Sequence, residues 1–170
     1  QWVKTNQDCL ESLADPYFGK KTLNQQPEKI NSCIGCNQAC LDHIFMNKRA
    51  SCLVNPKACY ENEYKMINTT EPKKIAVVGA GPSGLSAATT LAERGHTVFL
   101  FDENSEIGGQ FNLAKQVPGK IEFAETIRYF KSLIFELKIN LRLQQKISAK
   151  QLKEEKFDHV IIATGIKPRV

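Results

Sequence analysis

A glycine-rich turn directly after an apolar run constrains this chain more than any other feature. Residues 74–78 are mostly β-branched, and Gly79-Ala80-Gly81-Pro82-Ser83-Gly84 follows them at once. The run predicts a buried strand, and the proline predicts a helix that begins at Pro82. Glycines in this spacing permit a tight turn, close approach of the backbone to a pyrophosphate and close packing of helix on strand. The sequence therefore predicts a dinucleotide-binding turn.

The segments after this turn alternate between helix and strand. Apolar residues at helical spacing continue to Gly95, and residues 97–101 form a second apolar run. We expect a further helix at 121–137 and strands at 139–143 and 159–164. A strand, a helix and a strand of these lengths form a parallel unit. The predicted fold class is α/β, with a Rossmann-like parallel sheet.

An acidic residue supports the nucleotide interpretation. Asp102 ends the second apolar run, 18 residues beyond Gly84. A carboxylate in this position accepts two hydrogen bonds from an adenosine ribose and repels a 2′-phosphate. The alternative is a ligand-free α/β domain with an exposed aspartate, which the agreement of strand, turn, helix and acid disfavours.

The turn alone does not separate FAD from NAD. Gly108-Gly109-Gln110 lies where flavoproteins of the disulfide-reductase fold carry a second glycine pair, and Ala163-Thr164-Gly165 resembles their strand end over the flavin. Taken singly, each segment is also typical of an ordinary loop or strand end. Together with the turn they favour FAD.

All six cysteines precede Pro72, which ends a short polar connector. Two, three and eleven residues separate the candidate metal ligands, which are Cys33, Cys36, Cys40 and Cys52. Four thiolates hold either a zinc ion or an iron–sulfur cluster. The second CxxC pair of a typical structural zinc site is missing, which favours iron–sulfur. Cys9 and Cys59 are expected to be ordinary apolar-like thiols, with Cys59 the next candidate ligand.

Composition and charge argue against several classes of protein. The formal net charge is +5, but Lys and Arg are scattered without a run longer than two, unlike a nucleic-acid surface. No apolar run approaches the roughly 20 residues of a membrane-spanning helix, and no secretory leader is recognisable. We therefore expect a cytoplasmic globular protein without nucleic-acid or membrane partners.

The cysteine segment resembles one enzyme family. CIGCNQACLD at 33–42, SCLVNP at 51–56 and GGQFNLAK at 108–115 are similar to bacterial 2,4-dienoyl-CoA reductase. Members of that family are NADPH-dependent iron–sulfur flavoenzymes of the NADH:flavin oxidoreductase and trimethylamine dehydrogenase group. The similarity runs from about Leu13 to the C-terminus, whereas trimethylamine dehydrogenase and enoate reductases look less similar. The chain is thus expected to be an internal fragment.

The resemblance implies a three-part enzyme. A (β/α)8 barrel binds FMN and an unsaturated acyl-CoA substrate, a segment holds a [4Fe-4S] cluster, and two further domains bind FAD and NADPH. Residues 1–72 are then the barrel's tail and the cluster segment, and residues 73–170 the FAD domain, with the NADPH domain missing. Electrons pass from NADPH through FAD, the cluster and FMN to the acyl-CoA, in fatty acid β-oxidation. The fragment alone is not expected to complete this reaction.

The same resemblance assigns cofactor contacts residue by residue. The cluster ligands are the four cysteines at 33, 36, 40 and 52, and no residue of this chain is catalytic. The implied FAD contacts are Gly79, Ala80, Gly81, Pro82, Ser83, Gly84, Asp102, Gly109, Gln110, Lys120, Ala163, Thr164 and Gly165. Leu10 stands near the position where the family carries an arginine for the FMN phosphate. Leucine cannot replace that bidentate contact, so residues 1–12 are not expected to bind FMN.

Two alternatives remain open. A truncated, non-catalytic remnant keeps the dinucleotide fold and binds the AMP portion of a dinucleotide without a cluster. A zinc protein with four cysteine ligands binds zinc without flavin. The metal, sulfide and flavin content of the chain distinguishes these from an electron-transfer fragment.

Overall fold

A computed structural model describes residues 11–166, which form two compact units. The first unit comprises the described residues up to Lys65 together with Val117–Tyr129. The second comprises Met66–Gln116 and the described residues from Phe130 onward. The chain therefore leaves the first unit and returns to it before the second unit is complete.

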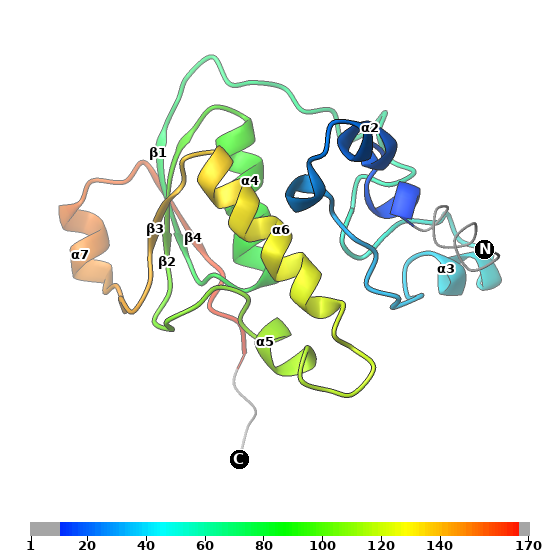
Figure 1. Cartoon of the computed structure of the whole chain (residues 1–170). Helices are drawn as coiled ribbons and strands as arrows, with labels where there is room; N and C mark the ends of the chain where they lie inside the picture. The colour runs from blue at the N-terminus through cyan, green and yellow to red at the C-terminus, as the bar shows by residue number, and fades with distance from the viewer. Residues whose placement is uncertain (1–10, 167–170) are drawn as a thin grey trace. The chain divides into compact units, whose positions relative to one another are not determined.

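The second unit is built on a four-stranded parallel sheet (Figure 1). The spatial order is β3-β2-β1-β4, with every neighbouring pair parallel. The strands are β1 (Lys74–Val78), β2 (Thr97–Phe101), β3 (Asn140–Arg142) and β4 (His159–Ile162). Because the chain crosses from β3 past β2 and β1 to β4, the strand order reverses next to β1. This reversal is the point where open α/β sheets bind their ligands.

Helix α4 (Pro82–Glu93) connects β1 to β2 and packs on both. Proline at its first position needs no backbone donor there. Its buried side chains include Leu85 and Ala88, and β1 buries Ile75, Ala76 and Val77 completely or nearly so. These apolar side chains pack between helix and sheet, which makes this interface the centre of the core.

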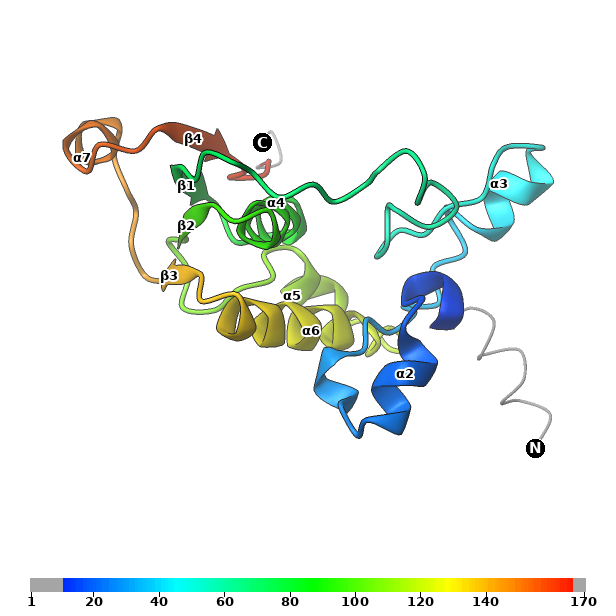
Figure 2. The ribbon, with the colours of Figure 1, turned by 90° about the horizontal axis from the view of Figure 1, so that it is seen from above.

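Helix α7 (Ala149–Glu154) lies on the opposite side of the sheet from α4 (Figure 2). Its start is fixed by a capping box between Ser148 and Gln151. Phe157, just beyond the helix, meets the rings of Phe99 and Phe101 edge-on, with centroids 5.3 and 6.0 Å away. Leu100 and Phe101 are neighbours on β2 and therefore face opposite sides of the sheet, yet both are fully buried. The contacts with Phe157 explain the burial of Phe101 on its side.

The first unit is held by short elements and polar contacts. It contains α2 (Phe18–Leu23), a 3-10 turn (Pro27–Lys29), α3 (Leu41–Phe45) and the first part of α6 (Phe123–Glu136). Its described, buried apolar side chains are few: Ala14, Ile34, Ala58 and Ile127. A unit with so little apolar core depends on hydrogen bonds to fix its loops.

Arg128 on α6 supplies several of those hydrogen bonds. Its guanidinium donates to the carbonyls of Pro27 at 3.1 Å, Glu28 at 2.8 Å and Ile30 at 2.9 Å. It also pairs with Glu125 at 2.6 Å. One planar fork thereby fixes the 27–30 turn to residues far away in the sequence.

The α/β parallel-sheet prediction is confirmed, with small differences at the ends of elements. The helix expected at 121–137 spans 123–136, the strand expected at 139–143 spans 140–142, and that expected at 159–164 ends at Ile162. The compact units divide after Lys65, and the N–H of Thr69 donates to the carbonyl of Arg94 at 2.8 Å within the second unit. The division into a cluster segment up to residue 72 and an FAD domain from residue 73 stays a prediction.

None of the helices in the described part of the chain is long and apolar enough to cross a membrane. Short α5 (Phe111–Ala114) completes the helices of the second unit.

Replacing Gly84 by alanine is expected to destabilise the second unit. A Cβ at Gly84 would lie 1.8 Å from the carbonyl oxygen of Gly79, so helix α4 would have to move away from β1. We expect the free energy of unfolding to fall by about 1–3 kcal/mol or more, measured by urea denaturation. Gly81→Ala is the control, because its Cβ meets nothing within 4 Å. Equal unfolding midpoints for the two variants would contradict the close-packing argument.

Candidate functional site

Three loops meet at the carboxyl edge of the sheet, beside the reversal of strand order. They follow β1 at Gly79, β2 at Asp102 and β4 at Ala163. Backbone hydrogen bonds extend the strand pairing into these loops: Gly79 N–H donates to the carbonyl of Phe101 and Ala163 N–H to that of Val78, both at 2.7 Å. The loops are therefore fixed by the sheet itself.

A crevice of two adjoining cavities, about 390 and 510 Å³, opens between these loops. Both cavities share a wall formed by Gly79, Asp102, Glu103, Asn104, Thr164 and Gly165. The larger one is also lined by further residues that the sequence predicts to contact FAD: Gly81, Pro82, Ser83, Gly109, Gln110 and Ala163. The structure thus brings most of the predicted cofactor contacts to one crevice.

Three predicted contacts lie elsewhere. Ala80 has no exposed surface and Gly84 is buried, so both belong to the packed part of the turn and neither lines the crevice. Lys120 belongs to the first unit, and its ammonium lies 6.0 Å from the ring centroid of Phe123. Its contact with FAD stays a prediction.

Gly81 leaves room for a ligand at the start of α4. Its φ of −74° is ordinary for any residue, and a Cβ there would point into open space. The first backbone N–H groups of α4 lack helical acceptors, and the helix dipole favours negative charge at this end. This combination suits a pyrophosphate group lying against the backbone of the turn.

The second glycine pair is tied to the same turn. Gly108 N–H donates to the carbonyl of Ala80 at 2.8 Å, and a Cβ at Gly109 would lie 2.9 Å from the Cα of Gly81. The two glycine-rich segments therefore line one side of the crevice together.

Asp102 has a structural task that sequence reasoning missed. The residue is only 8% exposed. Its Oδ2 accepts the N–H of Ala80 at 2.5 Å, and its Oδ1 accepts the backbone and side-chain N–H groups of Asn104 at 2.8 Å. A carboxylate has about four acceptor positions, so one remains for a ribose hydroxyl. The predicted pair of ribose hydrogen bonds would have to share these oxygens.

Sequence reasoning also missed the far wall of the smaller cavity, formed by Gln145, Lys146 and Ile147. Gln145 N–H donates to the carbonyl of Asp102 at 2.9 Å, which closes the loop after β3 onto the loop after β2. The signal that identifies these residues is their position directly beyond an expected parallel strand.

The four candidate metal ligands lie in the first unit. All four are half-buried and free of disulfides, whereas Cys59 is exposed. Ser51 N–H donates to the carbonyl of Ala39 at 2.7 Å, which brings the segment of Cys52 beside that of Cys40. Cys9 and Leu10, on which the sequence also made predictions, lie outside the described residues.

The thiols influence one another electrostatically. Burial raises the pKa of Cys33, and the charges of Cys36 and Cys40 raise it further. Burial likewise raises the pKa of Cys52, and the charges of Cys33 and Cys36 raise it further. Backbone N–H groups act in the opposite direction, among them that of Gly35, 3.4 Å from the sulfur of Cys33.

Within residues 11–166, no three His, Cys, Asp or Glu side chains are grouped so that they would hold a metal ion. The chemistry of the donor set nevertheless fits an iron–sulfur cluster. Four thiols share one unit, and N–H groups point at two of the sulfurs. Hydrogen bonds of this kind are a means by which proteins tune such clusters.

The parallel sheet, the glycine turn at a helix N-terminus and the crevice at the strand-order reversal define a dinucleotide-binding domain. The chain belongs to the pyridine nucleotide-disulphide oxidoreductase family, whose model matches residues 73–170. This membership agrees with the flavin and pyridine-nucleotide chemistry inferred from the sequence.

Curated relatives and solved structures extend the similarity over the cysteine segment. A metal reductase of Desulforamulus reducens is 40% identical over 160 residues, which cover 92% of this chain and 24% of the relative. An NADH oxidase of Thermoanaerobacter brockii is 35% identical over 158 residues, which cover 92% of this chain and 24% of the oxidase. The solved structure of a 2-naphthoyl-CoA reductase complexed with 2-naphthoyl-CoA is 39% identical with a TM-score of 0.93, and the match covers 95% of this chain and 25% of the reductase. The chain therefore spans about a quarter of the length of these relatives.

Gly81→Ala is expected to weaken dinucleotide binding while preserving the fold, because its Cβ would occupy the space left for the pyrophosphate. The affinity for FAD, followed by the change in flavin fluorescence, is expected to fall about tenfold or more, equivalent to roughly 1.4 kcal/mol. Wild-type affinity in a stably folded variant would mean that the phosphates lie elsewhere.

Asp102→Ala is expected to destabilise the second unit even without nucleotide. The change leaves the N–H groups of Ala80 and Asn104 without their acceptor, which costs about 1–3 kcal/mol of unfolding free energy. Thermal unfolding of the nucleotide-free chain measures this. The neighbouring Glu103→Ala is the control, because among the described residues the side chain of Glu103 makes one exposed ion pair, of 3.7 Å with Lys146. Asp102→Ala as stable as its control would limit Asp102 to a role in ligand binding.

Proposed function

We propose that this chain is the electron-transfer portion of an iron–sulfur flavoenzyme that reduces unsaturated acyl-CoA thioesters with NADPH. The observation that carries the proposal is the presence of four half-buried, disulfide-free thiols in one unit of a chain whose other unit has a dinucleotide crevice. Burial raises the pKa of Cys33 and of Cys52, and the charges of neighbouring thiols raise both further, which supports a shared ligand. When bound, a [4Fe-4S] cluster supplies one-electron transfer and FAD accepts two electrons from a pyridine nucleotide.

The chain's own residues would place these groups. Cys33, Cys36, Cys40 and Cys52 would bind the four irons of the cluster. Gly81 and the start of α4 would hold the FAD pyrophosphate, and Asp102 would hold the adenosine ribose. The hydrogen bond from Gly108 to Ala80 supports FAD over NAD, because it places the second glycine pair beside the turn.

The substrate class rests on the resemblance to 2,4-dienoyl-CoA reductase. It is supported by the similarity to a reductase whose substrate is also an acyl-CoA, 2-naphthoyl-CoA. Residues 1–72 would then be the end of an FMN-binding barrel with the cluster segment, and residues 73–170 the FAD domain. The barrel and the NADPH domain of the longer enzyme would complete the reaction, in the cytoplasm.

Anaerobic purification followed by metal, sulfide and flavin analysis tests the proposal. About four iron and four sulfide per chain with bound FAD are expected. Cys52→Ala should lose most of this iron, whereas Cys59→Ala, at an exposed cysteine of the same unit, should keep it. Zinc without flavin would support the zinc protein with four cysteine ligands instead. A dinucleotide bound without any metal would make the chain a non-catalytic remnant.

A further inference from the structure

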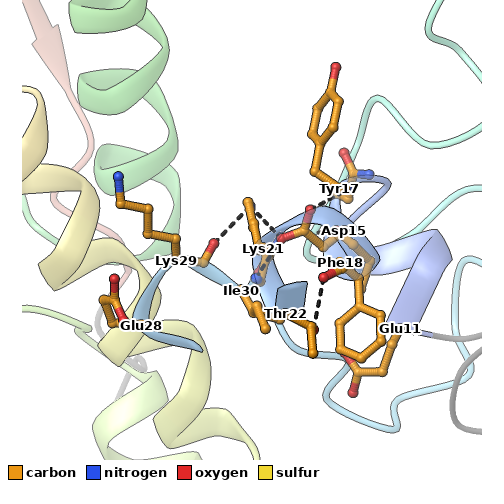
Figure 3. Close-up of polar contacts among 12 residues, drawn as sticks. Glu11, Asp15, Tyr17, Phe18, Lys21, Thr22, Glu28, Lys29 and Ile30 are labelled. Atoms are coloured by element: carbon orange, nitrogen blue, oxygen red, sulfur yellow. Dashed lines mark hydrogen bonds and ion pairs between the residues drawn. The ribbon is translucent and has the colours of Figure 1, made fainter. Parts of the chain in front are cut away.

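A buried carboxylate organises the start of the first unit. Asp15 is 3% exposed and follows the helical residues 11–14. It accepts three hydrogen bonds: from the ammonium of Lys21 at 2.5 Å, the N–H of Tyr17 at 3.0 Å and the N–H of Asn31 at 2.9 Å. Figure 3 shows Lys21 between Asp15 and the carbonyl of Lys29, to which it donates at 2.7 Å. Charge and hydrogen bonds together make this a rigid centre.

Asn31 extends this centre to both cysteine-bearing segments. It is 6% exposed, and its side-chain amide donates to the carbonyls of Ala14 at 3.2 Å and Val54 at 2.9 Å. Asn31 lies two residues before Cys33, and Val54 lies two residues after Cys52. One buried amide therefore connects the segment of the first candidate ligand to that of the fourth.

Two further hydrogen bonds tie the two cysteine-bearing segments to residues 11–15. The side-chain amide of Asn55 donates to the carbonyl of Leu13 at 3.0 Å. The N–H of Cys33 donates to the carboxylate of Glu11 at 3.1 Å. The short stretch 11–15 thus holds the Cys33 segment and the Cys52 segment at the same time.

We infer that Asp15 and Asn31 are positioning residues that set the separation between Cys33 and Cys52 for cluster binding. The inference rests on the proposed function, since it assumes that these cysteines share a cluster. Eleven residues separate Cys52 from Cys40, and the backbone hydrogen bond from Ser51 to Ala39 connects the Cys52 segment to Cys40 rather than to Cys33. The network supplies the connection to Cys33 from outside the cysteine motif, as residues around a metal site commonly do.

The donors of Asn31, rather than its acceptor, make this connection. Both side-chain N–H bonds are made to carbonyls, whereas its buried Oδ1 has no hydrogen-bond partner among the described residues. Asn31→Asp keeps the size and shape but places an acceptor against two carbonyl oxygens. It therefore breaks the connection between Ala14 and Val54 with little change in volume.

The experiment compares iron loss from the full anaerobic chain in wild type, Asn31→Asp and Asn24→Asp. Asn24 is exposed in the same unit, so it controls for the chemical change. We expect the Asn31 variant to lose iron to a chelator about 10–100-fold faster, with an altered electron paramagnetic resonance signal in the remaining reduced cluster. Asn24→Asp should match wild type.

A second variant separates positioning from general destabilisation. If Asn31 acts through Cys52, then N31D and Cys52→Ser, which keeps an oxygen donor at the fourth position, accelerate iron loss less than additively, whereas independent effects would add fully. Full additivity would overturn the inference. Should N31D not fold by circular dichroism, Asn55→Ala, which removes one part-buried hydrogen bond, decides by the same measurement.

The outcomes also distinguish the inference from the proposed function. A wild-type chain that binds no iron overturns both. A wild-type chain that binds iron, together with an Asn31 variant that holds it equally long and with the same resonance signal, overturns only the positioning role.

Discussion

The close approach of helix α4 to the end of β1 is the constraint on which the second unit depends. At Gly84 the helix comes so near the carbonyl of Gly79 that no side chain fits between them. This contact fixes the direction of α4, and with it the position of the backbone N–H groups at its N-terminus. The glycine turn that lines the crevice is therefore held in place by how the core packs. A site preorganised in this way spends little binding energy on ordering itself.

The sequence predicted the second unit well because its signals are local. Buried parallel strands such as 74–78 and 97–101 are continuous apolar runs, and a glycine turn between strand and helix has few structural alternatives. The helix at 149–154 was not predicted, although its capping box between Ser148 and Gln151 is a local signal of the same kind. The exact strand ends were less predictable, because hydrogen-bond pairing rather than residue type determines where a strand stops.

The first unit was much less predictable, and the reason is physical. Its organisation depends on hydrogen bonds between residues that are far apart in sequence, such as Asn31 with Val54 and Arg128 with Glu28. Such contacts have no periodicity, so neither hydrophobic spacing nor turn propensity indicates them. The cysteine spacing identified which residues form a candidate site but not what holds them in place. Likewise, the role of Asp102 in supporting the turn follows only from the geometry around Ala80.

Helix α6 has a consequence for how this protein evolved. Its first part, up to Tyr129, belongs to the first unit, and the rest belongs to the second. The cysteine-bearing unit is consequently not encoded by one continuous stretch of gene. A recombination event that transferred only the codons of the first 65 residues would leave behind Arg128 and the carbonyl contacts it makes with the 27–30 turn. The two units are thus expected to be inherited together, with a change in one compensated within the same gene.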